Sequence, residues 1–313
     1  MRGKVLKSTG SWYIVRDETN RLVPCRLAGH FRLRNIQNTN PISVGDWVDF
    51  EDEADNKGYI KEIEARKNYI IRKSVNLSKR AHIIAANLDQ SFLIIALVPP
   101  KTLLGFVDRF LATSEAYDIP THIVINKSDL HTENEEAELE YVQTVYERAG
   151  YPVHIVSTLT GQGVENLKEI LSGKTTLVSG NSGVGKSSLI NALDPTLALR
   201  TKEISKQHLQ GQHTTTFAEL FELSFNAEII DTPGIKSFGL LDMEKEEIGD
   251  YFPEIFELSK LCKFHNCIHL EEPGCAVIKA YEKNELAPSR YESYCRMIAS
   301  EEDQGPYRQD DFV

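Results

Sequence analysis

A glycine-rich octapeptide in the middle of the chain constrains the fold more than any other stretch. Residues 180–187 read G-N-S-G-V-G-K-S and match G-x-x-x-x-G-K-[ST], in which glycines let successive backbone N–H groups face one phosphate. A chance glycine-rich turn would also fit, but residues 175–178 favour a strand and residues 188–193 a helix. The stretch therefore predicts a P-loop, with Lys186 reaching the β/γ-phosphates and Ser187 ligating Mg²⁺.

A tetrapeptide at the end of another strand predicts which base is bound. The apolar run 92–97 is typical of a buried parallel strand, and the next strand, 121–125, leads into Asn126, Lys127, Ser128 and Asp129. Ligands of α/β folds lie at the carboxyl ends of such strands. An Asp carboxylate accepts two donors of guanine that adenine lacks, Asn126 would bond the N7/O6 edge, and the Lys127 stem would pack along the ring. A polar loop would look similar, but beside a P-loop the pattern favours guanine.

Three further segments complete the predicted site. After strand 153–156, a small polar loop with Ser157 and Thr158 would bring a backbone N–H to the guanine O6, which is a weak signal. Asp231 ends strand 227–230 and fits a role in the Mg²⁺ shell, and the Gly234 N–H would meet the γ-phosphate, although an ordinary turn is the alternative. The polar stretch ending in threonines 214–216 suits a switch segment.

The order of these motifs along the chain is permuted. In most GTPases the P-loop comes first, but here residues 126–129 precede residues 180–187, and residues 231–234 come last. Cutting a sheet at an exposed loop and joining its termini preserves the packed site. We therefore predict a circularly permuted P-loop GTPase domain over residues 69–240, with a parallel sheet flanked by helices.

The N-terminal segment, residues 1–68, has the short strands of a small barrel. Strands are expected at 12–15, 21–27, 45–50 and 58–63, which favours an OB-fold, a barrel that commonly binds oligonucleotides. Charge is relevant here, because the whole chain carries −11 while residues 1–80 hold 16 Lys/Arg against 10 Asp/Glu. Such asymmetry indicates either a face for a polyanion or ordinary surface variation.

A cysteine cluster marks residues 241–313, where we expect a helical zinc-binding domain with an acidic tail. The pattern Cys262-x4-Cys267-x-His269-x5-Cys275 offers four ligands, which is typical of one structural Zn²⁺ with no open catalytic position. His265 is the rival fourth ligand, and three free thiols of a reduced protein are the alternative. Helices are expected at 248–258 and 275–283. With no signal peptide and no apolar run long enough to span a bilayer, we expect a cytoplasmic protein with no membrane partner.

With these motifs in this order, the chain resembles the ribosome small-subunit-dependent GTPases of the RsgA family. The resemblance covers nearly the whole chain and implies an OB-fold, a permuted GTPase domain and a zinc domain. It implies hydrolysis of GTP to GDP and phosphate, rRNA binding, and late maturation of the small (30S) ribosomal subunit, which stimulates turnover. The implied nucleotide-binding set is Asn126, Lys127, Ser128, Asp129, Ser157, Thr158, Gly180, Asn181, Ser182, Gly183, Val184, Gly185, Lys186, Ser187, Ser188, Asp231 and Gly234.

The resemblance also bears on which residues carry out catalysis. Ile235 stands where many GTPases place a water-orienting Gln, and the family's switch histidine, here His213, is the proposed substitute, with Lys186 stabilising phosphate charge. Gln212 replaces the Arg usual in the family. Mg²⁺ is expected on Ser187, Thr215 and Asp231. We expect a monomeric GTPase, a phosphoric anhydride hydrolase. The rivals are an RNA-binding assembly factor that uses GTP as a structural ligand, and an ATPase.

Overall fold

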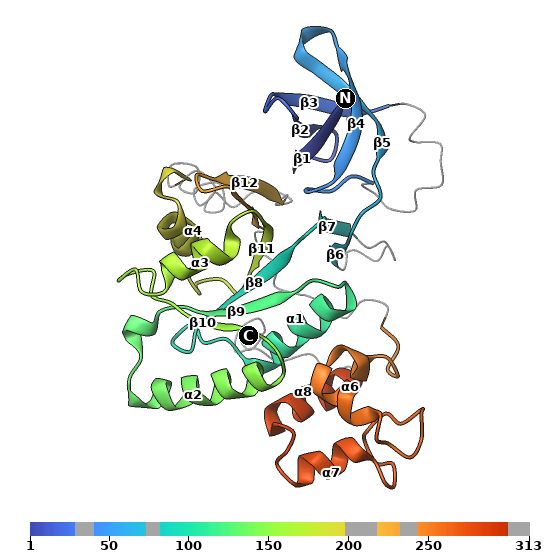
Figure 1. Cartoon of the computed structure of the whole chain (residues 1–313), viewed down its shortest axis with the longest axis vertical. Helices are drawn as coiled ribbons and strands as arrows, with labels where there is room; N and C mark the ends of the chain where they lie inside the picture. Colours follow the sequence, from blue (N-terminus) through green and yellow to red (C-terminus); the bar gives the residue numbers. More distant parts are fainter. Residues whose placement is uncertain (29–40, 73–81, 198–217, 232–242, 300–313) are drawn as a thin grey trace, which may run out of the picture.

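The computed structural model describes residues 1–28, 41–72, 82–197, 218–231 and 243–299. Figure 1 shows a small β-barrel at one end, a sheet flanked by helices in the middle, and a group of short helices at the other end. One eleven-stranded sheet runs through the first two parts. In the described ranges no helix is long and apolar enough to cross a membrane.

The barrel consists of five strands in the order β1-β2-β3-β5-β4, closed by pairing of β1 with β4. Its core holds alternate residues of each strand, such as Tyr13 and Val15, because successive strand side chains point to opposite faces. This arrangement confirms the predicted five-stranded barrel. The strands are β1 (Arg2–Ser8), β2 (Tyr13–Asp17), β3 (Leu22–Leu27), β4 (Trp47–Glu53) and β5 (Lys57–Ile63), with a short 3-10 turn η2 (Ala54–Asn56) before β5.

The central sheet has the order β10-β9-β8-β11-β13-β12. Neighbouring strands are parallel, except that β12 runs antiparallel to β13. The permuted fold predicted from the motif order is therefore present. The strands are β8 (Gln90–Ile95), β9 (Thr121–Ile125), β10 (Val153–Ile155), β11 (Thr175–Ser179), β12 (Glu219–Leu223) and β13 (Ala227–Asp231).

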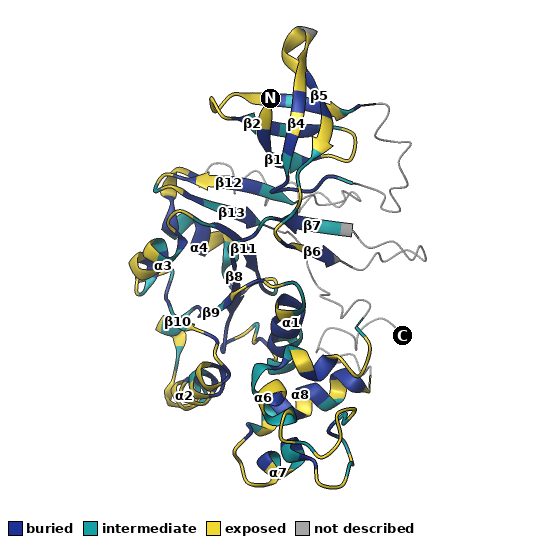
Figure 2. Ribbon diagram, turned by 45° about the vertical axis from the view of Figure 1, so that its right-hand side comes forward, coloured by how far each residue is buried: buried dark blue, intermediate teal, exposed yellow. Residues whose placement is uncertain are grey.

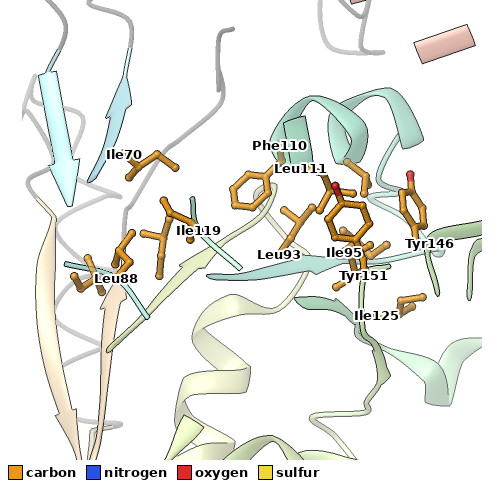
Figure 3. Close-up of a cluster of buried hydrophobic side chains, with 14 of the residues drawn as sticks. Ile70, Leu88, Leu93, Ile95, Phe110, Leu111, Ile119, Ile125, Tyr146 and Tyr151 are labelled. Atoms are coloured by element: carbon orange, nitrogen blue, oxygen red, sulfur yellow. The ribbon is translucent and has the colours of Figure 1, made fainter. Parts of the chain in front are cut away.

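Helices cover both faces of this sheet, and each face has its own apolar core. On one face, α1 (Leu104–Ala116) and α2 (Glu133–Arg148) pack on the odd-numbered residues of β8, and Figure 3 shows Leu93 and Ile95 against Phe110, Leu111 and Tyr146. On the other face, α3 (Val164–Leu171) and α4 (Lys186–Leu193) cover Phe92 and Ile94. Both sides of β8 are buried, which explains its continuous apolar run.

Two elements near the barrel differ from the sequence expectation. No strand was expected in residues 69–88, yet β6 (Tyr69–Arg72) and β7 (His82–Ala86) pair as antiparallel strands. Strand β1 was not predicted, and it joins the barrel to the central sheet by pairing Lys7 with Glu219 of β12. Its Lys4 is buried and forms an ion pair with Glu228 of β13. The predicted domain limits at 68 and 240 remain predictions.

The C-terminal region packs on α1 through a buried charge network. Arg290 of α8 donates to Asp108 of α1 at 2.7 Å and to Glu254 of α6 at 2.6 Å, and Tyr146 of α2 donates to Asp108 at 2.8 Å. The expected helix 248–258 is divided, because Pro253 begins a new helix. Figure 2 shows α6, α7 and α8 at the end of the molecule opposite the barrel. The elements are η5 (Ile248–Tyr251), α6 (Pro253–Ser259), α7 (Ala276–Glu282) and α8 (Pro288–Ile298); η3 (Ser128–Leu130) and η4 (Pro195–Leu197) lie in the central part.

Candidate nucleotide site and metal cluster

The glycine-rich loop joins β11 to α4 in a conformation that requires its glycines. Gly180, Gly183 and Gly185 have φ values of 144°, 84° and 99°. A Cβ on Gly180 would lie 2.2 Å from the Ile94 carbonyl oxygen, and one on Gly185 would lie 2.2 Å from the Asn126 side-chain nitrogen. The loop therefore passes close to β8 and to the residue that follows β9. It brings the two predicted motifs into contact although 50 residues separate them.

Lys186 and Ser187 begin α4, and the N–H groups at the N-terminus of a helix are suited to bind an anion. The Lys186 ammonium donates to the carbonyl oxygens of Gly180 at 2.6 Å and Asn181 at 2.9 Å, so it lies across the mouth of the loop. Burial lowers the pKa of Lys186, and the negative charge of Asp231 opposes that shift. Ser187 and Ser188 are exposed on the first turn of the helix. This geometry presents one cation and two hydroxyls to a phosphate chain.

Asn126 holds the surrounding loops together, and its expected contact with the base stays a prediction. Its side chain is fully buried, donates to the Val184 carbonyl oxygen at 2.9 Å, and accepts from the Thr158 N–H at 3.2 Å. Each polar end of the amide thus has one partner within the protein, while an Asn amide can donate twice and accept twice. Asn126 ties the P-loop, the 126–129 segment and the 157–160 loop together.

Asp129 is the exposed carboxylate of this group, and a buried hydroxyl orients it. Ser157 donates to Asp129 Oδ1 at 2.5 Å and accepts from the Thr160 N–H at 3.1 Å. Lys127 adopts a left-handed conformation, with φ 67°, and its ammonium donates to the Pro99 carbonyl oxygen at 3.3 Å. Ser128 lies beside Gln162, 3.4 Å between side-chain oxygens. Asp129 is therefore exposed while Ser157 orients its carboxylate, as a base-binding edge requires.

Of the remaining residues predicted for Mg²⁺ binding and catalysis, the structure describes Asp231 but not His213, Thr215 or Gly234. Asp231 ends β13 and pairs in register with Val178, two residues before the P-loop. His213, Thr215 and Gly234 lie outside the described residues, as does Ile235. Sequence reasoning missed the Pro99–Pro100 turn after β8, where a Cβ on Gly183 would lie 2.8 Å from Pro100. The signal was present, because two prolines directly follow a buried parallel strand.

The four expected zinc ligands converge in the C-terminal region. The ligand atoms of Cys262, Cys267, His269 and Cys275 all lie within 4.8 Å of one another. His269 Nδ1 is 3.7 Å from the Cys262 sulfur and 3.4 Å from the Cys275 sulfur. The rival, His265, is exposed and is not part of this group. Three sulfurs and one imidazole nitrogen at these separations fit a closed tetrahedral metal site.

Helix α8 braces the segment that carries these ligands. Tyr291 donates its hydroxyl to the His269 carbonyl oxygen at 2.7 Å, and Tyr294 donates to the Ile268 carbonyl oxygen at 2.7 Å. Burial raises the pKa of Cys267 to about 12 and lowers the pKa of His269. Sequence reasoning missed α8 and therefore this support. The cluster is thus held by helical packing as well as by its own ligands.

Comparison with known proteins identifies relatives of the whole chain. The RsgA GTPase family matches residues 63–241, and the RsgA N-terminal domain matches residues 2–60. A small ribosomal subunit biogenesis GTPase RsgA of Christiangramia forsetii is 54% identical, covering 100% of this chain and 99% of its own length. The protein of the same name from Bacteroides fragilis is 52% identical, covering 98% of this chain and 99% of its own length.

Two solved structures resemble the fold described above. YjeQ from Thermotoga maritima has a TM-score of 0.77 at 34% identity, covering 96% of this chain and 98% of its own. YloQ, described as a circularly permuted GTPase, has a TM-score of 0.74 at 34% identity, covering 97% and 96%. The motif order and the sheet order of this chain thus have counterparts in determined structures.

Proposed function

The chain belongs to the RsgA GTPase family, and we propose that it hydrolyses GTP to GDP and phosphate during biogenesis of the small ribosomal subunit. One observation supports this function most directly. The Asn126 amide joins the P-loop to the segment that carries Asp129, so the phosphate-binding and base-binding elements form one site despite their permuted order. An assembly factor that only binds GTP as a structural ligand is less favoured, because the family is one of GTPases.

Within this site each residue has a role in our proposal. Asp129, held by Ser157, accepts the two donors on one edge of guanine, and the Lys127 stem covers the ring. On GTP binding Lys186 leaves the carbonyl oxygens of Gly180 and Asn181 and pairs with the β/γ-phosphates. Backbone N–H groups of residues 181–188 bind the same phosphates. The exchange of partners is favourable because a phosphate carries full negative charge and a carbonyl only a partial one.

Hydrolysis requires a water molecule in line with the bond to the γ-phosphate. We propose that His213 orients this water, since Ile235 cannot, and that Gly234 donates its N–H to the γ-phosphate. Ser187, Thr215 and Asp231 would hold Mg²⁺, which neutralises charge on the phosphate oxygens. An exposed Ser187 and a half-buried Asp231 at adjoining strand and helix ends fit this demand.

The other two parts of the chain serve the partner in our proposal. The barrel and the other basic residues within positions 1–80 would bind rRNA of the small subunit. One structural Zn²⁺ would be held by Cys262, Cys267, His269 and Cys275. The chain would act as a monomer in the cytoplasm. Its GTP hydrolysis would be slow in isolation and faster on the subunit, because its own water-positioning group is unusual. GTP hydrolysis would then signal that the chain has bound the small subunit.

The experiment is GTP hydrolysis by the purified chain, measured as phosphate release with and without purified small subunits. Lys186→Ala should lower the rate roughly 100-fold, the size of effect seen when a charge-stabilising group is lost. Asp129→Asn should weaken GTP binding and favour xanthosine triphosphate, because an amide donor matches the carbonyl of xanthine. Unchanged nucleotide choice in that variant would instead favour an ATPase.

His213 requires a separate measurement in the presence of the partner. His213→Ala should lower hydrolysis on the subunit far more than it lowers GTP affinity, because the water and not the nucleotide loses its partner. Equal rates with and without subunits would count against the stimulated mechanism. Unchanged turnover of His213→Ala on the subunit would remove this residue from catalysis.

A further inference from the structure

The outer face of the barrel has a pocket of about 290 Å³, where the β1–β2 turn meets the end of β3. It is lined by Gly10, Ser11, Trp12, Tyr13, Arg26 and Leu27. Pockets for drug-sized ligands span about 300–1,000 Å³, so this one has room for a single planar ring system rather than a folded segment. It is separate from the nucleotide site, which lies at the carboxyl ends of the central strands.

The strand register places two complementary side chains at this pocket. Tyr13 of β2 pairs with Cys25 of β3, and both side chains point into the barrel core. Because strand side chains alternate, the next step along the pair places Trp12 opposite Arg26 on the outer face. The Arg26 guanidinium lies over the Trp12 indole, 3.9 Å from the ring centroid. The pocket thus contains one planar cation lying over one aromatic ring, and we call this pair the Trp12–Arg26 platform.

The charge of Arg26 is not balanced in the way that other barrel arginines are. Arg2 pairs with Glu64, and Arg21 pairs with Asp17 and Asp52. Among the described residues Arg26 forms no ion pair, its side chain is exposed, and none of the six lining residues is acidic. A stacked guanidinium without a carboxylate partner is available to an anionic ligand that also has a flat face.

We propose that this pocket takes one unpaired base of single-stranded RNA, stacked on the Trp12–Arg26 platform with its phosphate next to Arg26. The proposal rests on the proposed function, because it assigns a binding position on the barrel for the RNA partner. Every base has a π-face and every nucleotide a phosphate, so the platform and its charge match both parts. A paired base offers neither face to a side chain, and the pocket therefore selects unpaired segments.

The test uses the two tryptophans of the chain as reporters. In Trp47→Phe the emission comes from Trp12 alone, and in Trp12→Phe from Trp47 alone. A single-stranded RNA decamer should quench the emission of Trp12 with saturation, while a duplex of equal length should quench it weakly. The Trp12→Ala variant of the full chain should bind the decamer roughly 5- to 150-fold more weakly, as measured by fluorescence anisotropy of labelled RNA.

Arg26→Gln and Arg2→Gln form a matched pair, because each removes one positive charge from a guanidinium stacked on an indole. Arg26→Gln should weaken decamer binding severalfold more than Arg2→Gln does. Equal losses in both, quenching by duplex as strong as by single strand, or quenching of Trp47 alone would overturn the proposal. Displacement of the decamer by an acidic peptide at equal concentration would do so too, by assigning the pocket to a protein ligand.

GTP hydrolysis and its stimulation by subunits are measured on the same preparations. Stimulated turnover together with absent Trp12 quenching overturns the base-binding pocket and leaves the proposed function standing. Absent turnover and absent stimulation overturn the proposed function itself, whatever the fluorescence shows. The two failures are therefore distinguishable.

Discussion

Replacing Arg290 by methionine should release the C-terminal helices from α1. The Arg290 side chain is 1% exposed and makes charge-assisted hydrogen bonds to Asp108 at 2.7 Å and to Glu254 at 2.6 and 3.1 Å. Glu254 is 17% exposed and can be rehydrated when the cation is lost. Asp108 is 0% exposed and cannot. The cost is therefore dominated by one uncompensated buried carboxylate, about 3–5 kcal/mol.

A double-mutant cycle separates this cost from the loss of packing. Asp108→Leu with Arg290→Met removes both buried charges, so the pair should be less destabilised than the sum of the two single variants by at least about 2 kcal/mol. Lys260→Met removes a surface pair with Glu257 in the same region and should cost less than about 1 kcal/mol. It is the matched control for loss of a cation.

Hydrogen exchange of the α8 amides measures the local free energy of opening, which suits a chain of several parts. A loss of about 4 kcal/mol corresponds to an increase of about a thousandfold in exchange rate. Additive effects in the cycle would refute the reasoning, since they would mean that Asp108 and Arg290 stabilise the interface independently. Exchange in Arg290→Met no faster than in Lys260→Met would refute it as well.

Three further outcomes are expected. Asn126→Ala should lower GTP affinity at least about tenfold in a fluorescent-nucleotide titration, because the Val184 carbonyl oxygen loses its donor and the loops separate. Unchanged affinity would contradict the proposal that Asn126 joins the P-loop to the 126–129 segment. Burial and the neighbouring imidazole of His154 lower the pKa of His122 to about 4, below its value of 6.5 in an unfolded chain. The contribution of His122 to stability is therefore full above pH 6.5 and is lost as the pH falls towards 4. The melting temperature of His122→Phe should therefore fall less over that range, and a parallel fall in both proteins would contradict this. Cys275→Ser should lose bound zinc, measured by atomic absorption, and lower the melting temperature, whereas His265→Ala should retain one zinc per chain.

The elements with a strong periodic or apolar pattern were predictable from the sequence. The expected strand 121–125 agrees with β9 residue for residue, because it has clear patterning and polar limits. The P-loop was predictable for another reason, since its glycines are required by the backbone itself. The convergence of the four ligands in the C-terminal region followed from spacing alone.

What the sequence left open depended on contacts between distant segments. Strand β1 has Lys4 where an apolar residue would be expected, and only the partners Thr175 and Glu228, far along the chain, explain how that lysine is buried. The contact of Asn126 with the P-loop could not be predicted for the same reason, because its partner Val184 is 58 residues away. Helix α8 was missed since its buried arginine reads as a surface residue until Asp108 is placed beside it.

The pairing of β1 with β12 also concerns the edges of the central sheet. An open parallel sheet has two edges whose unpaired N–H and C=O groups attract other strands. Here one edge, β12, is covered by β1, which itself belongs to a closed barrel. The opposite edge strand, β10, is three residues long and follows a proline at position 152. Removal of the barrel would therefore leave an edge of the central sheet open to pairing with strands of other molecules.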